Sequence, residues 1–465
     1  MDNVMGKVTQ ETLDLVKSQL TVEKAITTST GLMGYSLEAP AQQLVPFLSP
    51  IRNRTSRNTA KTGTSVHWNA ITAINTNGKL TTVEGTRSNT VAYTTVSRLA
   101  NFVTYGLQDV VTLEAISAGR NYDDVKARAT TNLLMKLMTE EEKLMIGGNK
   151  TPLGTVSAPV ATPASGGALS AGTLSVKVCA LTLSAMNRVV ANTPMAGLTI
   201  PVYDGITLPS SATSATVTAN QLINCSVTPK LGALGYAWFI GTAGNESLQA
   251  VTTTSTYVCS TLYAGGTLAT AVTADTSGDA LSFDGIIPQI ISGSGYVKDF
   301  NAGKLTRAFG GVQELDDMNS MFFQKLKVTP TRYLVSEQVS RDITSAIIGG
   351  QGAPLFQVSQ GEKGNITANY VVTEYINKSF GGYRIPIEVH PWLPNGSMIA
   401  ITEQLPYPNA NVPAVLEMEM GYDYQQLEYA FTNPQYEFEV RAFGCLKYYF
   451  PVGGAFLCNI AQGVN

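Results

Sequence analysis

The middle of the chain, residues 151–278, carries almost no charge, and this constrains its fold more than any other feature. Thr, Ser, Ala, Gly and Val dominate the segment. Its charged side chains are Lys177, Arg188, Asp204, Lys230, Glu246 and Asp275. Short runs of alternating apolar and polar residues, separated by turn residues, begin at Leu174, Ile223, Gly235 and Ser255. This pattern is typical of small β-sandwiches. We therefore predict an all-β sandwich over residues 151–280, inserted into the rest of the chain.

The first 50 residues predict an extended arm. A short helical stretch is followed by mostly extended sequence with many breakers, namely Gly31, Gly34, Pro40, Pro46 and Pro50. Such a segment does not form a compact unit alone. We expect residues 1–50 to become ordered by lying on a neighbouring chain.

Residues 51–105 predict a long β-hairpin. Two β-rich runs, Ser65–Ile74 and Asn89–Val96, flank the Asn77-Gly78 pair, which favours a tight turn. Few of these residues could fill a private core. Because an isolated hairpin is marginally stable in water, we expect this one to pack on another chain.

Residues 106–150 contain the clearest helix signal. Between residues 121 and 148, apolar side chains recur at spacings of three, four or seven. This stripe consists of Tyr122, Val125, Ala129, Leu133, Leu137 and Leu144. Asn121 is a candidate N-cap, and Gly147-Gly148 ends the pattern. A helix over Tyr122–Ile146 would extend roughly 37 Å, and a shorter helix is predicted at Leu107–Ala118.

After Leu281 the pattern returns to mixed α/β. One helix is predicted from a Thr306 cap to Met318, and another after a Ser336 cap. The predicted strands are Thr331–Val335, Ala368–Ile376, Tyr383–Val389 and Ser397–Thr402. The end of the chain is strand-rich. We predict an α+β fold overall, with further regions at residues 281–410 and 411–465.

Charge and cysteine usage narrow the function classes. Charged residues make up 14% of the chain, against roughly 25% in ordinary soluble domains, which favours extensive uncharged contact surfaces. The formal net charge of -3 shows no basic excess for gripping nucleic acid. The five cysteines are widely spaced, without a CxxC pair, and predict buried reduced thiols rather than a metal or redox site. The sequence shows no secretory signal or apolar membrane span, and we expect no cofactor.

Several motifs, in their order along the chain, resemble those of the tailed-bacteriophage major capsid family, which has the Johnson fold. They are PFLSPIRN (Pro46–Asn53), SVHWNAI (Ser65–Ile71), VEGTR (Val83–Arg87), EEEKLMIGGN (Glu140–Asn149) and LSFDGIIPQI (Leu281–Ile290). The resemblance covers most of residues 35–150 and 280–460. It implies an N-terminal arm, an extended loop, a spine helix, and peripheral and axial domains. The middle segment resembles an immunoglobulin-like or fibronectin type III module.

The resemblance implies a shell subunit rather than an enzyme. Such a subunit would form the hexamers and pentamers of an icosahedral phage head around double-stranded DNA, touched by weak non-specific contacts. Other partners would be portal, scaffold and decoration proteins, with assembly in the host bacterial cytoplasm and no membrane. Two alternatives stay open. One is an encapsulin-like compartment shell, and the other is a secreted adhesin or surface-layer protein.

The resemblance also implies roles for single residues. The expected inter-subunit contacts of the extended loop are Trp68, Asn77, Gly78, Lys79, Glu84 and Arg87. The expected spine-helix residues are Tyr122, Val125, Leu133, Leu137 and Leu144. Some relatives form a Lys–Asn isopeptide bond with an assisting Glu, which makes Lys79 a crosslink candidate beside Glu84. A solvated turn lysine is the simpler interpretation.

The remaining chemistry-bearing residues favour structural roles. His67 and His390 lie in unrelated patterns without catalytic partners. The run Glu140–Glu142 predicts a solvated helix face, or one neutralised by a partner chain's Lys or Arg. Four aromatic residues of the middle segment could form a carbohydrate platform, although a sandwich core needs such residues too. They are Trp238, Phe239, Tyr257 and Tyr263.

Overall fold

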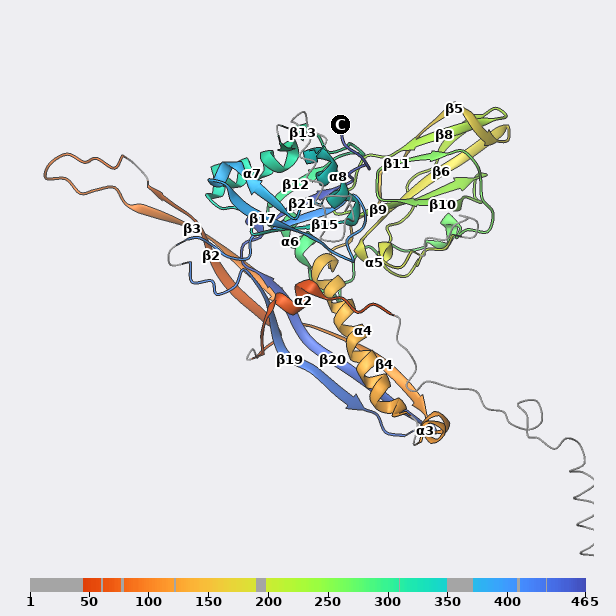
Figure 1. Cartoon of the computed structure of the whole chain (residues 1–465), viewed down its shortest axis with the longest axis horizontal. Coiled ribbons are helices and arrows are strands. Elements are labelled where there is room, and N and C mark those ends of the chain that lie inside the picture. The colour runs from red at the N-terminus through yellow and green to blue at the C-terminus, as the bar shows by residue number, and fades with distance from the viewer. Residues whose placement is uncertain are drawn as a thin grey trace, which may run out of the picture.

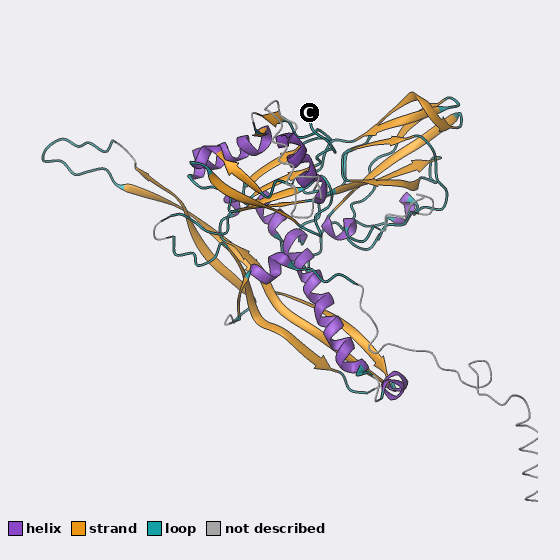
Figure 2. Cartoon of the chain, viewed as in Figure 1, coloured by secondary structure: helices purple, strands orange, loops and turns teal. Residues whose placement is uncertain are grey.

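The computed structural model describes residues 45–59, 62–76, 79–120, 123–189, 198–308, 310–348, 371–407, 410–431 and 433–465. Figure 1 shows four regions: a long hairpin, an elongated sheet with a helix along it, a central sheet with helices, and the strands of the middle segment. The hairpin reaches away from every helix (Figure 2). The arm predicted at residues 1–50 lies almost wholly outside the described residues.

The elongated sheet has the strand order β1-β19-β20-β4. Its strands are β1 (Ser56–Asn58), β19 (Leu416–Glu428), β20 (Gln435–Tyr448) and β4 (Val103–Thr112). β1 runs parallel to β19, and the other pairs are antiparallel. Helix α4 (Val125–Gly147) lies along this sheet because its Leu133 and Leu137 share a core with Val111, Phe438 and Val440.

The start of α4 and the segment before it differ from prediction. Asp124 caps α4 by accepting a hydrogen bond from the Ala127 backbone N–H at 3.1 Å, and Asn121, the predicted cap, lies outside the described residues. The shorter helix α3 covers only Leu113–Gly119. The predicted helical start at Leu107 was wrong, because residues 103–111 alternate between half-buried or buried and exposed positions as a strand of this sheet.

The hairpin consists of β2 (Ser65–Thr76) and β3 (Val91–Asn101), paired antiparallel. Thr76 pairs with Val91, so residues 77–90 form the connection. The two β-rich runs predicted at Ser65–Ile74 and Asn89–Val96 match β2 and β3. Asn77 and Gly78 themselves lie outside the described residues.

The central sheet has the order β12-β21-β18-β15-β17-β16. Its strands are β12 (Tyr296–Asp299), β21 (Ala455–Cys458), β18 (Met398–Ile401), β15 (Arg332–Val335), β17 (Tyr383–Val389) and β16 (Glu374–Asn377). Both faces are buried: in β18, Met398 and Ala400 join the core beneath α7 and α8, whereas Ile399 and Ile401 join the core that reaches α4. The helices are α6 (Ile286–Ser292), α7 (Gln313–Leu326) and α8 (Glu337–Ile348).

The strand predictions at Thr331–Val335 and Tyr383–Val389 match β15 and β17. The helix predicted from Thr306 begins instead at Gln313, because the chain first forms a short hairpin. The remaining short elements are α2 (Pro50–Arg54), α5 (Leu183–Met186), β13 (Arg307–Ala308), β14 (Gly311–Val312), η1 (Ala269–Ala271), η2 (Lys378–Phe380) and η3 (Pro451–Gly453).

The middle segment forms two antiparallel sheets, with orders β10-β9-β6-β7 and β11-β8-β5. Their strands are β5 (Val160–Leu169), β6 (Gly172–Leu181), β7 (Thr213–Val217), β8 (Gln221–Ser226), β9 (Gly235–Gly241), β10 (Ser247–Thr252) and β11 (Thr256–Cys259). In an immunoglobulin constant-type domain the first strand pairs with the second. Here the first strand, β5, pairs with β8. This pairing differs from the constant-type order, and the immunoglobulin-like or fibronectin type III likeness stays a prediction.

The four-stranded sheet of this segment is covered on both faces. In β9, Trp238 and Ile240 face the second sheet, while Ala237 and Phe239 pack in a separate core beside Leu198. All four side chains are completely buried. A strand buried on both faces reads as a continuous apolar run rather than an alternating one, as the sequence GYAWFIG does.

Two sets of contacts hold the middle segment against the rest of the chain. At its root, the Gly285 backbone N–H donates to the Gly148 carbonyl at 2.7 Å, and Asn149 Nδ2 donates to the Ser277 carbonyl at 3.1 Å. At a second place, the Ser255 backbone N–H donates to Asn459 Oδ1 at 2.8 Å, and Asn459 Nδ2 donates to Ser255 Oγ at 3.0 Å. The segment is therefore fixed at two points.

Candidate functional site

A group of charged side chains is buried where α4 ends. This buried charge cluster consists of Arg52, Arg57, Glu141, Glu142 and His390. Glu141 is completely buried and forms ion pairs with Arg52 Nε at 3.2 Å and Arg57 Nη1 at 3.0 Å. The hydroxyls of Tyr105, at 2.5 Å, and Tyr424 also donate to this carboxylate. Four donors from β4, β19 and the N-terminal side thus converge on one carboxylate.

Glu142 holds α2 and the loop after β17. Its carboxylate accepts the backbone N–H groups of Ile51 at 2.9 Å and Arg52 at 2.6 Å, the free donors at the start of α2. His390 Nε2 lies 2.7 Å from the same carboxylate. Because His390 Nδ1 accepts the Trp392 backbone N–H at 3.3 Å, we assign the imidazole proton to Nε2, which donates to Glu142.

The electrostatics of the cluster follow from burial and charge. Burial, and then the charge of Glu141, raise the pKa of the Tyr105 and Tyr424 hydroxyls well above the ordinary range. Burial alone would lower the pKa of Arg57, but its hydrogen bond to Asp423 and the charge of Glu141 raise it instead. The tyrosines therefore stay protonated as donors, and Arg57 stays charged.

The cluster joins parts that are far apart in the sequence. Arg52 and Arg57 precede the hairpin, Glu141 and Glu142 end the long helix, and His390 belongs to the central-sheet region. Removing one member of a buried ion pair typically costs about 3–5 kcal/mol. The cluster thus sets the direction in which the chain enters the hairpin.

The hairpin itself exposes an unusual amount of apolar surface. Its exposed large apolar side chains are Ile71, Ile74, Leu80, Val83, Val91, Tyr93, Val96 and Leu99. Leu80 is 94% exposed and Tyr93 is 63% exposed. Tyr93 and Val96 lie on opposite faces of β3, since side chains alternate along a strand. In the strand pairing, one face of the hairpin carries most of these side chains, namely Ile71, Ile74, Val91, Tyr93 and Leu99, and that face is therefore apolar and uncovered.

The extended-loop residues do not form one site. Lys79, Glu84 and Arg87 lie exposed in the connection between the two strands. Trp68 lies at the base of the hairpin, where its ring packs edge-on against Tyr449. Asn89 Nδ2 donates to the Lys79 carbonyl at 2.6 Å, and the Lys79 side chain remains a crosslink candidate without further support.

The spine-helix residues lie as an amphipathic stripe predicts. Leu133 and Leu137 are buried, while Val125 and Leu144 are half-buried. Tyr122 lies outside the described residues. The expectation for Glu140–Glu142 was wrong for two of its members. Glu141 and Glu142 are buried and paired within the chain, whereas Glu140 pairs with Lys136 and Lys143 on the helix surface.

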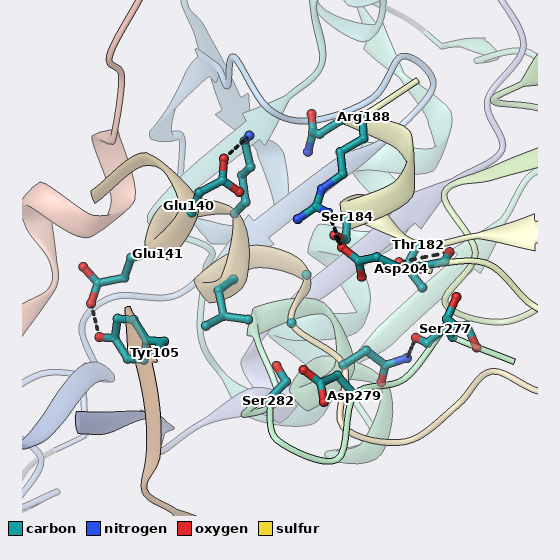
Figure 3. Close-up of a pocket in the computed structure, with 18 of the residues that line it drawn as sticks. Tyr105, Glu140, Glu141, Thr182, Ser184, Arg188, Asp204, Ser277, Asp279 and Ser282 are labelled. Carbon is teal, nitrogen blue, oxygen red and sulfur yellow. Dashed lines mark hydrogen bonds and ion pairs between the residues drawn. The ribbon is translucent and has the colours of Figure 1, made fainter. Parts of the chain in front are cut away.

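A cavity of about 240 Å³ lies between α4 and the root of the middle segment, and several charged and hydroxyl-bearing side chains line it. Figure 3 shows Arg188, Asp204 and Ser184 on one side and Glu140 and Glu141 on the other. Asp204 pairs with Arg188 at 3.0 Å and accepts from Ser184 Oγ at 2.5 Å. These charges neutralise one another. Neither histidine of the chain lines the cavity, so Ser184 has no imidazole base there.

The other candidate residues are structural in the described part of the chain. His67 is exposed and contacts Ser65 Oγ at 3.1 Å. All five cysteines are buried and unpaired, as predicted, and burial raises the pKa of the Cys259 thiol to about 11. Among the described residues, no three His, Cys, Asp or Glu side chains form a group that could hold a metal ion.

The aromatic residues of the middle segment do not form a carbohydrate platform. Trp238 and Phe239 are completely buried, and Trp238 stacks on Tyr257 with ring centroids 6.1 Å apart. Their role is core packing. In the described chain, no helix combines the length and the apolar character needed to cross a membrane.

Sequence reasoning missed the cationic half of the buried charge cluster. Arg52, Arg54 and Arg57 form a dense basic run in a weakly charged chain, and Glu140–Glu142 form a dense acidic run. The opposite charges of the two runs were the sequence signal that could have predicted the ion pairs. Tyr105 and Tyr424 gave no such signal, because single tyrosines in strands are common.

No family model matches the sequence, and no curated protein does. Among solved structures, the capsid of Myoviridae phage XM1 is similar at 9% identity, with 94% of this chain and 100% of that chain covered and a TM-score of 0.44. The capsid of the native GTA particle is similar at 8% identity, with 95% of this chain and 100% of that chain covered and a TM-score of 0.44. The holo-SrpI encapsulin complex from Synechococcus elongatus PCC 7942 is similar at 8% identity, with 94% of this chain and 97% of that chain covered and a TM-score of 0.42.

Proposed function

We propose that this chain is the major capsid protein of a tailed phage. Copies of it would form the hexamers and pentamers of an icosahedral head that encloses double-stranded DNA. The observation that carries the proposal is the hairpin, which projects from the molecule with a row of exposed apolar side chains along one face. Monomeric proteins rarely leave such a surface uncovered.

The physics of the hairpin favours coverage by another subunit. Fully burying a side chain such as Leu or Val is favourable by about 1.5–3 kcal/mol, and Ile74, Leu80 and Val83 are each at least 65% exposed. Obligate interfaces of this kind stabilise the subunit only through assembly. A subunit that depends on its neighbours suits a closed shell.

The order of elements also supports the proposal. The hairpin, the long helix, the central sheet and the terminal long strands follow one another as the sequence resemblance implies. In this proposal α4 with the elongated sheet is the peripheral domain, and the central sheet is the axial domain. Residues 151–280 are an inserted domain facing outward, and residues 1–50 are an arm on neighbouring subunits.

Electron microscopy of the purified chain, expressed with its neighbouring genes, tests the proposal. Closed particles containing double-stranded DNA are expected, with terminase and portal genes nearby. Closed particles that hold protein cargo and no genome would favour the encapsulin-like alternative. Sheets, filaments or monomers alone would contradict any closed shell, and sheets would favour the surface-layer alternative.

A further inference from the structure

A pocket at the base of the hairpin holds hydrogen-bond donors that lack acceptors. Trp68 of β2 and Arg98 of β3 are directly opposite each other in the hairpin register, so their side chains share one face. Both line a pocket of about 260 Å³, together with Lys150 and Asp284 from the root of the middle segment.

One of these donors is removed from water without compensation, and a second belongs to a half-buried side chain. The Trp68 Nε1–H group is buried and has no hydrogen-bond partner. The Arg98 guanidinium is half-buried and forms no hydrogen bond or ion pair with any described residue. Burial lowers the pKa of Arg98. An unpaired buried donor is costly, so this arrangement favours an acceptor from outside.

The charge of the pocket specifies an anion. Arg98 and Lys150 are cations, and Asp284 is the only carboxylate of the lining. One oxygen of Asp284 already accepts the Lys150 backbone N–H at 2.9 Å. A carboxylate suits the vacant donors, because a guanidinium binds two carboxylate oxygens at once.

The hairpin tip presents such a carboxylate. Residues Val83–Thr86 form a turn closed by the Thr86 backbone N–H on the Val83 carbonyl at 3.1 Å. Gly85 takes a φ of 79°, which a turn of this kind requires at its third position. Glu84 precedes it at the apex, is exposed, and has no partner among the described residues.

Glu84 cannot reach the pocket of its own chain. Trp68 lies at the base of β2, and the strand continues to Thr76, a distance of roughly 26 Å along an extended strand. Glu84 lies beyond that end, so a second copy must supply the carboxylate. A tip-to-base contact is heterologous, and such contacts close into rings when repeated by rotation.

We propose that Glu84 at the hairpin tip of one copy binds in the Trp68–Arg98–Lys150 pocket of the next copy. This inference rests on the proposed shell function and names the pair of surfaces that would order the subunits within a ring. The ion pair would form head to tail around each capsomer.

Zero-length carbodiimide crosslinking of assembled particles tests the contact without any variant. Particles built from mixed ¹⁴N- and ¹⁵N-labelled chains should give a Glu84–Lys150 crosslink between differently labelled peptides. Glu114, which is exposed on α3, serves as the control carboxylate and should not couple to Lys150. Assembled particles without the Glu84–Lys150 crosslink would overturn the inference and leave the shell function intact.

Charge reversal supplies a second test. Glu84→Arg should lower the yield of assembled particles roughly tenfold, because it opposes two cations. The pair Glu84→Arg with Arg98→Glu should restore the yield to within roughly twofold, whereas Glu114→Arg with Arg98→Glu should not. Wild-type yield from Glu84→Arg would refute the contact. The contact would also be refuted if Arg98→Glu formed shells in normal yield but without packaged DNA. That result would show that the pocket binds a DNA phosphate instead. A wild-type chain that forms no particles would instead refute the shell function.

Discussion

His390 Nε2 lies 2.7 Å from Glu142 Oε1, and both side chains are almost completely buried. The contact joins the central-sheet region to the last turns of α4. The same carboxylate holds the first free N–H groups of α2. One glutamate therefore fixes three segments, and its removal affects all of them.

Glu142→Ala should strongly destabilise the subunit. The substitution leaves the His390 N–H and two backbone N–H groups without an acceptor, and we expect a loss of about 3–5 kcal/mol in the free energy of unfolding. Urea denaturation of the unassembled chain measures it. Glu140→Ala is the matched control, because Glu140 pairs only with partly exposed lysines, and it should cost at most about 1 kcal/mol. Equal losses in both variants would contradict the role assigned to Glu142.

Asp423→Asn should make the free energy of unfolding depend less on pH in the acid range. Burial alone would raise the pKa of Asp423, but the hydrogen bond and charge of Arg57 hold it below its ordinary value. Because the folded-state pKa is the lower one, ionised Asp423 stabilises the fold above the unfolded value of about 3.9, and the contribution disappears as the pH falls through the folded value.

The effect should be below about 1 kcal/mol, since the Asp423 side chain is 37% exposed. Unfolding free energies between neutral pH and roughly pH 2.5 measure it. The wild type should lose more stability across the acid range than Asp423→Asn does. Parallel curves for the two proteins would show that Asp423 contributes nothing.

Gly148→Ala should disturb the root of the middle segment. A Cβ at this position would lie 2.6 Å from the Leu144 carbonyl oxygen and 2.7 Å from that of Phe283. Both are backbone atoms that cannot turn aside, so we expect a cost of about 1–3 kcal/mol in thermal unfolding. Gly172→Ala is the control, because its Cβ would meet no atom within 4 Å. A melting temperature unchanged by Gly148→Ala would show that the root can relax.

Asn459→Gly should loosen the second attachment of the middle segment. Asn459 has a φ of 60°, which glycine adopts readily, so the substitution removes only the side-chain hydrogen bonds to Ser255, Ala302 and Asp299. We expect a loss of about 2–4 kcal/mol and faster amide exchange around Ser255. Asn411→Gly, at an exposed position with a φ of 52°, should leave exchange there unchanged. Unchanged exchange in Asn459→Gly would show that the attachment is dispensable.

The double substitution Leu80→Ser with Val83→Ser should separate assembly from folding. Both side chains are largely exposed in the single chain, so the unfolding free energy should change by less than about 0.5 kcal/mol. Particle yield, measured by sedimentation, should fall roughly tenfold. Val258→Ser, at an exposed position of the middle segment, should leave the yield unchanged. Normal yield from the double variant would remove the hairpin tip from the assembly contacts.

The sequence predicted those helices and strands that neighbouring residues in the chain determine. The Ser336 cap is real, since Ser336 Oγ accepts the Val339 backbone N–H at 3.5 Å. The strand Tyr383–Val389 was found because β-formers cluster there. Leu107–Val111 was read as helix because Leu107, Val110 and Val111 also fit a three-to-four spacing. Only pairing with β20 decides for the strand.

The buried charge cluster was not predictable, because its members are far apart in the sequence. Glu141 and Glu142 read as a solvated run because their partners stand at residues 52, 57 and 390. Tertiary contacts outweigh the local preference there.

The cap on α2 has a consequence for synthesis on the ribosome. Glu142 lies 91 residues after Ile51, and His390 lies 248 residues after Glu142. Contacts of such high sequence separation close late, because the intervening chain must first be present. We expect the segment that aims the hairpin to stay unoriented until most of the nascent polypeptide has emerged. Oligomerisation would then be deferred until translation is nearly complete, which protects polysomes from premature association.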